Sequence, residues 1–150
     1  MKKKILTYSL IILIALIFIL FFVFLIIKSP ITPVLENNTV VNIIDGDTFE
    51  YYDADSESIK IVRLLCVDSP EKNEEGYDEA KLFLESIILD KQIIMTSSIT
   101  DKDAYGRELR YVYLYDEDDN NLFINKLILE EGHGKLLIIP PEECKELINW

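Results

Sequence analysis

An apolar run near the N-terminus constrains this chain more than any other feature. It extends from Ile5 to Ile27, 23 positions, and its only polar side chains belong to Thr7, Tyr8 and Ser9. As a helix it is about 35 Å long, at about 1.5 Å per residue, whereas a hydrocarbon core is about 30 Å thick. It also lacks the polar face that a helix on a globular domain needs. The sequence therefore predicts a transmembrane helix within residues 1–28.

The flanks of this run predict an uncleaved signal anchor. Signal-peptide cores are about 7–15 residues long and end at a small-x-small cleavage site. Here the longer run is followed by Lys28-Ser29-Pro30, without such a site, which disfavours secretion after cleavage. Three lysines, at positions 2–4, precede the span and one follows it, so the N-terminus is expected in the cytoplasm. We expect a single-pass protein of the cell membrane with an extracellular C-terminal domain.

The remainder of the chain is predicted to be one acidic domain. Residues 29–38, which include Pro30 and Pro33, predict an extended linker. Residues 39–150 have the size of a single domain. All 27 Asp and Glu residues follow Lys28, as do only 11 of the 15 Lys and Arg residues, so this part carries a formal charge of −16. Nucleic-acid binding normally uses a basic surface, so here it would need a locally positive site.

Hydrophobic periodicity predicts the secondary structure of this domain. Short runs rich in β-branched and aromatic residues predict strands at residues 39–44, 48–52, 59–67, 92–97 and 107–115. Within this domain we expect a first helix around residues 80–88. A second helix is expected to end at Gly132, and a third to begin near Pro141. Together these patterns predict an α+β fold with a curled antiparallel sheet. Two helical stripes support the first two helices: Ala80, Phe83, Leu84, Ile87 and Ile88, then Phe123, Ile124, Leu127 and Ile128.

Two cysteines, Cys66 and Cys144, are too few for a disulfide scaffold. Cys66 alternates with apolar residues in an expected strand, so a buried free thiol is the default prediction. A bridge to Cys144 stays open, because an exterior location would permit it.

Charged residues at predicted strand ends carry the chemistry. Taken separately, Asp47 and Asp68 are each explained as well by a structural role in a turn as by a functional role. Together they can converge on one hard cation. Arg63 lies inside an apolar strand and needs either a carboxylate partner or a phosphate. A cation site with Arg63, Arg107 and a spare carboxylate would suit the hydrolysis of a phosphodiester.

Three motifs occur in order and carry a resemblance. They are Asp45-Gly46-Asp47-Thr48, Arg63-Leu64 with Asp68-Ser69-Pro70-Glu71, and Asp103-Ala104-Tyr105-Gly106-Arg107. From about Thr39 to Lys135 the chain resembles the staphylococcal nuclease (thermonuclease) family. The resemblance implies a five-stranded OB-fold barrel with two to three helices. It also implies a calcium-dependent nuclease that cleaves the 5′ P–O bond of DNA or RNA and leaves 3′-phosphate ends, with no obligate protein partner.

The resemblance also implies a role for each matching residue. Calcium would be bound by two carboxylates and one main-chain oxygen, and two guanidinium groups would stabilise the transition state. A glutamate would orient or deprotonate the attacking water. The residues concerned are Asp47, Asp68 and the main-chain oxygen of Ser69 for calcium, Arg63, Glu71 and Arg107 for catalysis, and Tyr105 for substrate binding.

Departures from the family pattern concern substrate contacts. Ala104 stands where the family often has Lys, which removes one phosphate contact. Ile138 stands where the best-known member has a base-stacking Tyr. Stacking of one base on an aromatic ring is worth about 1–3 kcal/mol, so the substrate is expected to bind more weakly or differently.

Two other functions are compatible with parts of the pattern. A non-catalytic OB-fold module could bind nucleic acid or protein at the cell surface, since fold does not determine function. Such a module would be expected to have lost one of Arg63, Glu71 and Arg107, and all three are present. An acidic calcium-binding surface module would leave Arg63 unexplained.

The orientation of the chain is the first testable prediction. The lysine asymmetry across the span places residues 39–150 outside the cell. Protease added to intact cells should therefore remove the domain, as judged by immunoblotting, while a cytoplasmic control protein stays intact. Protection of the domain until the cells are lysed would contradict this orientation.

Overall fold

The computed structural model describes residues 14–22, 24, 37–114 and 121–148. The chain divides into two compact units, Met1–Val34 and Leu35–Trp150. In the first unit, residues 14–22 and 24 are helical. The predicted span, Ile5 to Ile27, and the linker, residues 29–38, thus fall largely outside the described residues. Within the described part, no helix has both the length and the apolar character needed to cross a membrane.

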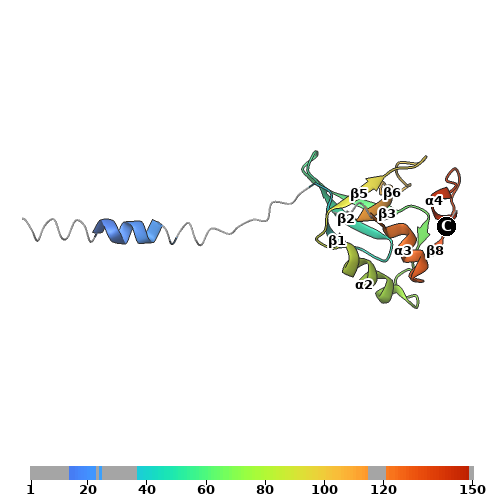
Figure 1. The fold of residues 1–150 in the computed structure, drawn as a ribbon, viewed down its shortest axis with the longest axis horizontal. Helices are drawn as coiled ribbons and strands as arrows, with labels where there is room; N and C mark the ends of the chain where they lie inside the picture. Colours follow the sequence, from blue (N-terminus) through green and yellow to red (C-terminus); the bar gives the residue numbers. More distant parts are fainter. Residues whose placement is uncertain (1–13, 23, 25–36, 115–120, 149–150) are drawn as a thin grey trace, which may run out of the picture. The chain divides into compact units, whose positions relative to one another are not determined.

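The second unit is built on a curled mixed sheet that forms a half-barrel (Figure 1). Its strands run in the spatial order β1-β2-β3-β6-β5, and β7 pairs with β6. The sheet is mixed because β3 and β6 are parallel, which corrects the antiparallel sheet predicted from the pattern. A parallel pair needs a long connection, and here α2 and β5 lie between the two strands in the chain. The bounds are β1 (Thr39–Ile43), β2 (Thr48–Asp53), β3 (Ser58–Leu64), β5 (Ile93–Thr96), β6 (Glu108–Leu114) and β7 (Leu122–Phe123).

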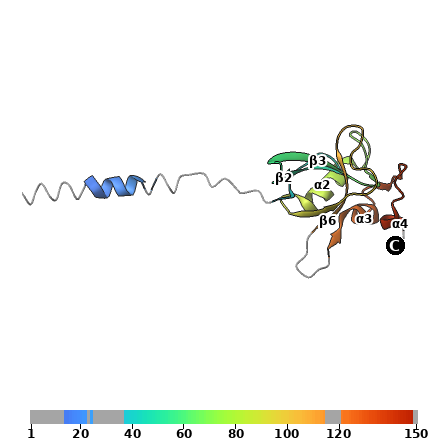
Figure 2. The same cartoon turned by 90° about the horizontal axis from the view of Figure 1, so that it is seen from above.

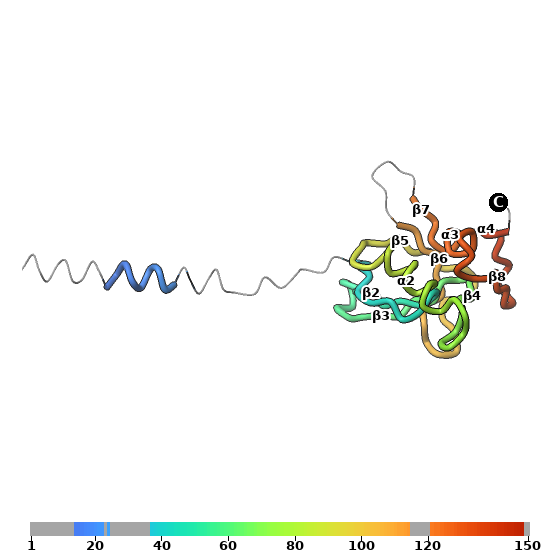
Figure 3. Tube along the Cα trace, turned by 90° about the horizontal axis from the view of Figure 1, so that it is seen from below, coloured from blue at the N-terminus to red at the C-terminus, as the bar shows by residue number. Residues whose placement is uncertain are grey.

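The outer strands of this sheet meet where it curls, as the trace in Figure 3 lets the reader follow. Val40 N–H donates to the Lys91 carbonyl at 3.0 Å, and Ile93 N–H donates to the Asn38 carbonyl at 3.1 Å. These bonds tie the start of β1 to the start of β5. The two edge strands thus satisfy part of each other's backbone, which otherwise would be open to pairing with another chain.

Three helices accompany the sheet in the described part of this unit (Figures 1 and 2). They are α2 (Tyr77–Ile88), α3 (Ile124–Glu130) and α4 (Lys145–Ile148). The predicted apolar stripe of α2 packs towards β1 and buries Ala80, Leu84 and Ile88 completely. The end of α3 also agrees with the prediction, since Gly132 follows it with a φ of 76°. The predicted start of the third helix, near Pro141, is wrong. The helix begins at Lys145, four residues later.

Helices and sheet share a continuous apolar core. Phe49 and Val62 come from β2 and β3, Leu84 from α2, and Ile128 from α3, all of them fully buried. A second cluster forms around Cys66, Tyr111, Cys144 and Leu147. The first cluster fixes the sheet against its helices, and the second fixes the C-terminal segment against β6.

The third strand differs from its prediction. We expected one strand over residues 59–67, but β3 ends at Leu64 and Cys66 adopts a left-handed backbone with a φ of 64°. The chain resumes as β4 (Val67–Asp68), which pairs with β8 (Lys135–Leu136) in a separate two-stranded sheet. The apolar run from Leu64 to Val67 continues without interruption across the bend, which is why the pattern did not reveal it. The bend directs Asp68 away from the line of β3.

Asn125, the second residue of α3, supports this bend. Its side chain is fully buried. The Nδ2 group donates to the Leu65 carbonyl at 2.9 Å and to the Arg110 carbonyl at 3.1 Å, and Oδ1 accepts the Val112 N–H at 2.8 Å. One amide thus satisfies three backbone groups where the ladder between β3 and β6 ends.

The two cysteines form a disulfide, Cys66–Cys144, with Cα atoms 6.0 Å apart. The default prediction of a free buried thiol is therefore wrong, and the bridge that the sequence left open is present. It links the bend after β3 to the C-terminal segment, 78 residues later in the chain. In the chain-entropy account, such long-range crosslinks restrict the unfolded state most.

Removal of the Asn125 amide should destabilise the domain strongly. Asn125→Ala removes the side-chain partner of the Val112 N–H and of the Leu65 carbonyl, whereas the Arg110 carbonyl still accepts the Leu65 N–H. Because each buried unpaired group costs about 1–3 kcal/mol, we expect the free energy of unfolding in urea to fall by at least about 2 kcal/mol. The matched control is Asn42→Ala, because the Asn42 side chain is exposed and donates to the Glu50 carboxylate rather than to buried backbone. Its effect should stay within about 0.5 kcal/mol. Similar losses in the two variants would contradict the role of Asn125.

Candidate active site

The turn between β1 and β2 positions Asp47. Asp45 Oδ1 accepts the Asp47 N–H at 3.1 Å, which closes the turn. Gly46 is required by space, because a Cβ there would lie 2.6 Å from the Ala80 Cβ and 2.8 Å from the Ser69 Cβ. The turn therefore packs directly on α2 and on the segment that follows β4. This contact presents Asp47 to the interior.

The Asp47 carboxylate is buried, with 2% of the residue exposed. Its Oδ1 accepts hydrogen bonds from the Thr48 hydroxyl and from Arg63 Nη1, both at 2.8 Å. Its Oδ2 accepts the Ser69 N–H at 2.9 Å. Burial raises the pKa of Asp47 to about 6, and this effect outweighs the lowering by Arg63 and by the Ser69 N–H. The carboxylate is thus held ionised at neutral pH by the charge that faces it.

Arg63 joins the two carboxylates. Its Nη1 donates to Asp47 Oδ1 at 2.8 Å and its Nη2 donates to Asp68 Oδ1 at 3.0 Å. The Arg63 side chain is only 14% exposed, whereas that of Asp68 is 47% exposed. One planar guanidinium therefore holds a buried and a half-exposed carboxylate on the same side. The structure thereby supplies the carboxylate partner that the sequence required for a buried-face arginine.

The carboxylates fit a hard divalent cation. Asp47 and Asp68 contact the two terminal nitrogens of the same guanidinium, and carboxylate oxygens are the ligands that calcium prefers. Asp47 Oδ2 accepts one hydrogen bond and keeps a further lone pair. In the part of the chain that the structure describes, no three His, Cys, Asp or Glu side chains are grouped for a metal. The third ligand implied by the resemblance, at Ser69, is a main-chain oxygen.

A cavity of about 520 Å³ brings the predicted catalytic residues together. Arg63, Glu71, Tyr105 and Arg107 all line it. The parallel register helps to explain the pair of arginines. Arg63 is opposite Leu109 of β6, and Arg107 lies directly before β6, two residues from Leu109, so all three residues line the same cavity. Because Arg63 also contacts Asp47 and Asp68, the cavity and the carboxylate pair form one site.

Arg107 is held by a residue to which the sequence assigned no role. Asp103 Oδ2 accepts the Arg107 Nε–H at 2.6 Å, and Asp103 Oδ1 accepts the backbone N–H groups of Tyr105 and Arg107 at 2.9 and 3.0 Å. Burial would raise the pKa of Asp103, but the hydrogen bonds from Arg107 outweigh it and lower that pKa. The Arg107 guanidinium also lies 5.4 Å from the centre of the Tyr105 ring. The signal for Asp103 was its place at the start of the third motif.

The remaining predicted residues are more exposed. Glu71 is exposed, and its N–H donates to Glu74 Oε2 at 2.8 Å. Tyr105 is 86% exposed.

A second residue missed from sequence is Glu142, which is buried beside the cavity and accepts the Thr100 N–H at 2.6 Å. No sequence pattern distinguished this glutamate from the solvated acidic residues around it.

The curled sheet, the buried carboxylate and the two guanidinium groups at one cavity define a nuclease-type domain. A family model described as "Staphylococcal nuclease homologue" matches residues 61–147, more than half of the chain. The chain therefore belongs to the staphylococcal nuclease family.

Individual relatives agree with this assignment. A thermonuclease of Staphylococcus intermedius is 32% identical over 114 residues, which cover 72% of this chain and 64% of the relative. An uncharacterized protein of Methanocaldococcus jannaschii is 31% identical over 135 residues, or 73% of this chain and 63% of the relative. An uncharacterized endonuclease of Escherichia coli O157:H7 is 33% identical over 85 residues, covering 57% and 53%. The chain thus spans between about half and two thirds of these curated relatives.

The raised pKa of Asp47 predicts how pH acts on this site. A carboxyl group with a raised folded-state pKa favours folding below its unfolded pKa, and that contribution is lost as pH rises towards about 6. A divalent cation needs the ionised form. Calcium affinity of the purified chain, measured by calorimetry, should therefore fall by roughly tenfold per pH unit below about pH 6. Asp47→Asn should remove calcium binding, and a pH-independent affinity over this window would contradict the assignment.

Proposed function

We propose that this chain is a calcium-dependent nuclease that hydrolyses phosphodiester bonds of DNA or RNA. The observation that carries the proposal is the single cavity lined by Arg63, Glu71 and Arg107, next to the carboxylates that Arg63 holds. Phosphoryl transfer needs positive charge around the transferred group and a positioned water. Family membership and the names of two relatives, an uncharacterized endonuclease and a thermonuclease, support the same chemistry.

Each residue has a role in the proposed reaction. Arg63 and Arg107 donate hydrogen bonds to the equatorial oxygens of the phosphate as their charge increases, and Arg107 also stabilises the leaving oxygen. Glu71, exposed at the cavity, orients the attacking water or accepts its proton. Asp47, Asp68 and the main-chain oxygen of Ser69 hold calcium. Calcium supplies positive charge beside the scissile phosphate when bound.

The location of the activity is part of the proposal. The apolar run from Ile5 to Ile27 and the lysines before it support a membrane anchor with the catalytic domain outside the cell. The disulfide Cys66–Cys144 is consistent with this location, because disulfides persist in oxidising compartments. The proposed substrate is therefore nucleic acid outside the cytoplasm.

A nuclease assay on the full chain, purified in detergent, tests the proposed function. Single-stranded DNA and RNA should be cleaved with calcium and left intact with a chelator. Binding of the nucleic acid without cleavage in saturating calcium would favour the alternative, a non-catalytic OB-fold binding module. Full activity in chelator would refute the calcium mechanism.

Substitutions in the cavity should affect turnover together. Loss of one charge-stabilising donor typically costs about 10²–10³ in rate, so Arg63→Ala and Arg107→Ala should each lower kcat by that factor. Arg63→Lys should be nearly as damaging, because an ammonium group cannot reproduce the planar fork. Glu71→Gln should also lower kcat. Losses in double variants should not add, since the groups serve one step.

These variants need a measure of folding and a matched control. Circular dichroism should show that each purified variant is folded before its turnover of single-stranded DNA is measured. Glu85→Gln on α2 makes the same change as Glu71→Gln outside the cavity and should leave kcat unchanged. Near-parental turnover of both Arg63→Ala and Arg107→Ala would contradict the assignment.

A further inference from the structure

A second groove continues from the active-site cavity. It has a volume of about 260 Å³ and is lined by residues 59–61 of β3 and by the loop that leads into β6. Lys102, Tyr105 and Arg107 line both the groove and the cavity. A chain-like substrate that places one phosphate at Arg107 therefore has a direct path along β3.

The charges of this groove differ from those of the rest of the domain. Three cations, Lys60, Lys102 and Arg107, line it against one carboxylate, Glu108. Glu108 is buried, and its Oε2 already accepts bonds from Arg110 Nη2 at 3.1 Å and from the Tyr51 hydroxyl at 3.0 Å. The lining of the groove thus holds more cations than carboxylates, in a part of the chain that carries −16. Two of these cations pair with carboxylates outside the lining, Lys60 with Asp53 and Arg107 with Asp103, which leaves Lys102 as the cation available to a phosphate.

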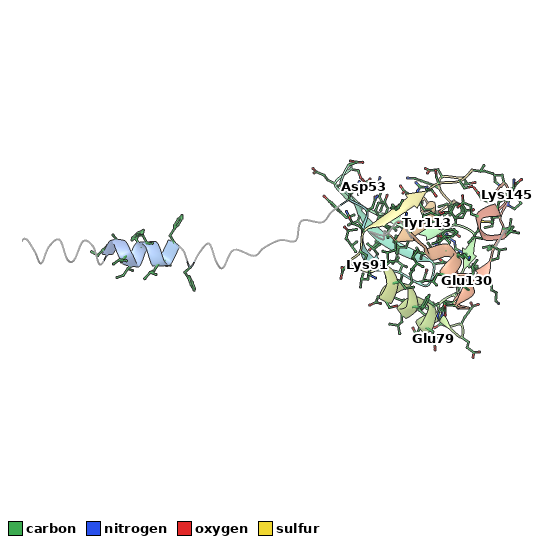
Figure 4. The ribbon with its side chains drawn as sticks, in the orientation of Figure 1. Asp53, Glu79, Lys91, Tyr113, Glu130 and Lys145 are labelled. Carbon is green, nitrogen blue, oxygen red and sulfur yellow. A yellow bond between two sulfur atoms is a disulfide. The ribbon has the colours of Figure 1, made fainter. Side chains whose placement is uncertain are left out.

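The site also borders a surface that is unfavourable for a polyanion. A different cavity, of about 450 Å³, borders Asp68 and is lined by three further carboxylates, those of Glu74, Glu75 and Glu79, against one lysine, Lys135. Figure 4 shows Glu79 on α2 and Asp53, the ion-pair partner of Lys60, on different sides of the domain. Electrostatics therefore favours the groove along β3 over the cavity near α2.

Lys102 is the cation of the groove best placed to bind a phosphate. Lys60 already pairs with Asp53, and Arg107 is held by Asp103. Lys102 is 51% exposed, and its ammonium lies 3.9 Å from Glu108 Oε1, a distance that is long for an ion pair. Lys102 also precedes by two residues Ala104, the position at which the family often has a lysine.

The groove is bordered by apolar and aromatic side chains that can contact nucleic-acid bases. Ile59 and Ile61 are 49% and 37% exposed on the same face of β3, and Tyr105 is 86% exposed. Aromatic and apolar faces that flank a cationic groove bind the unpaired bases of a single strand. A duplex would keep its base faces stacked inside and could not use these contacts.

We propose that this groove binds a single strand of nucleic acid next to the scissile phosphate, with Lys102 contacting the adjacent phosphate and Tyr105, Ile59 and Ile61 contacting its base. The proposal rests on the proposed function for the identity of the scissile site. In this arrangement the substrate leaves the scissile site along β3, and Lys102 replaces the phosphate contact that Ala104 lacks.

Binding of a fluorescent single-stranded octathymidylate to the full chain in detergent tests the groove. Fluorescence anisotropy in chelator measures Kd without cleavage, at several salt concentrations. Lys102→Ala should raise Kd several-fold and reduce the slope of log Kd against log salt by about 0.7, the value for one phosphate contact on a single strand. Lys102→Glu should raise Kd further, because it places a negative charge beside the phosphate.

Lys91→Ala and Lys91→Glu are the matched controls, since Lys91 is exposed on the connection between α2 and β5 (Figure 4) and lines neither cavity nor groove. They remove the same net charge and should leave Kd within about twofold. Equal losses at Lys91 and Lys102, or an unchanged Kd in both Lys102 variants, would overturn the proposal.

A separate cleavage assay of the unsubstituted chain with calcium separates the two hypotheses. Binding that depends on Lys102 but without cleavage would support the groove and overturn the nuclease proposal. Cleavage with binding that is insensitive to Lys102 would support the nuclease and overturn the groove.

Discussion

The ion pairs of Arg63 with Asp47 and Asp68 are the interactions on which the site depends. A buried carboxylate such as Asp47 is costly without an opposite charge, as its raised pKa indicates. Arg63 supplies this charge from the middle strand of the sheet, where β2 and β6 both flank it. Its other terminal nitrogen holds Asp68, which belongs to the segment after the bend. One side chain therefore connects the turn before β2, the strand β3 and the segment that follows the bend.

The bend at Leu65 and Cys66 makes this connection possible. If β3 had continued straight, Asp68 would lie further along the same strand and could not return to Arg63. The left-handed backbone of Cys66, the Asn125 amide and the disulfide to Cys144 all stabilise the change in direction. Structural features that look unrelated in the sequence thus serve the position of one carboxylate.

The net charge of the chain differs from the local charge beside the active site. A net charge of −16 beyond Lys28 repels nucleic acid on average, yet the groove beside the cavity is lined by three cations and one carboxylate. Repulsion elsewhere would favour the approach of a polyanion along this groove, because charges in solution act over only about 8 Å at physiological salt.

The sequence by itself determined the residue types of the site and most of the secondary structure. Strands β1, β2, β5 and β6 and the stripe of α2 agree with their predictions because alternation and helical periodicity are local properties. The motifs identified the family for the same reason, since they are short and contiguous. Tertiary structure alone decided the parallel pairing of β3 with β6, the bend after Leu64, the disulfide and the role of Asp103. The pairing and the disulfide depend on contacts between residues far apart in the chain, and the bend depends on a backbone conformation that a buried side chain does not signal. The role of Asp103 depends on a local turn, which a single carboxylate in a motif does not specify. The carboxylate types at positions 47 and 68 are therefore visible in the sequence, but their convergence on Arg63 follows only from the fold.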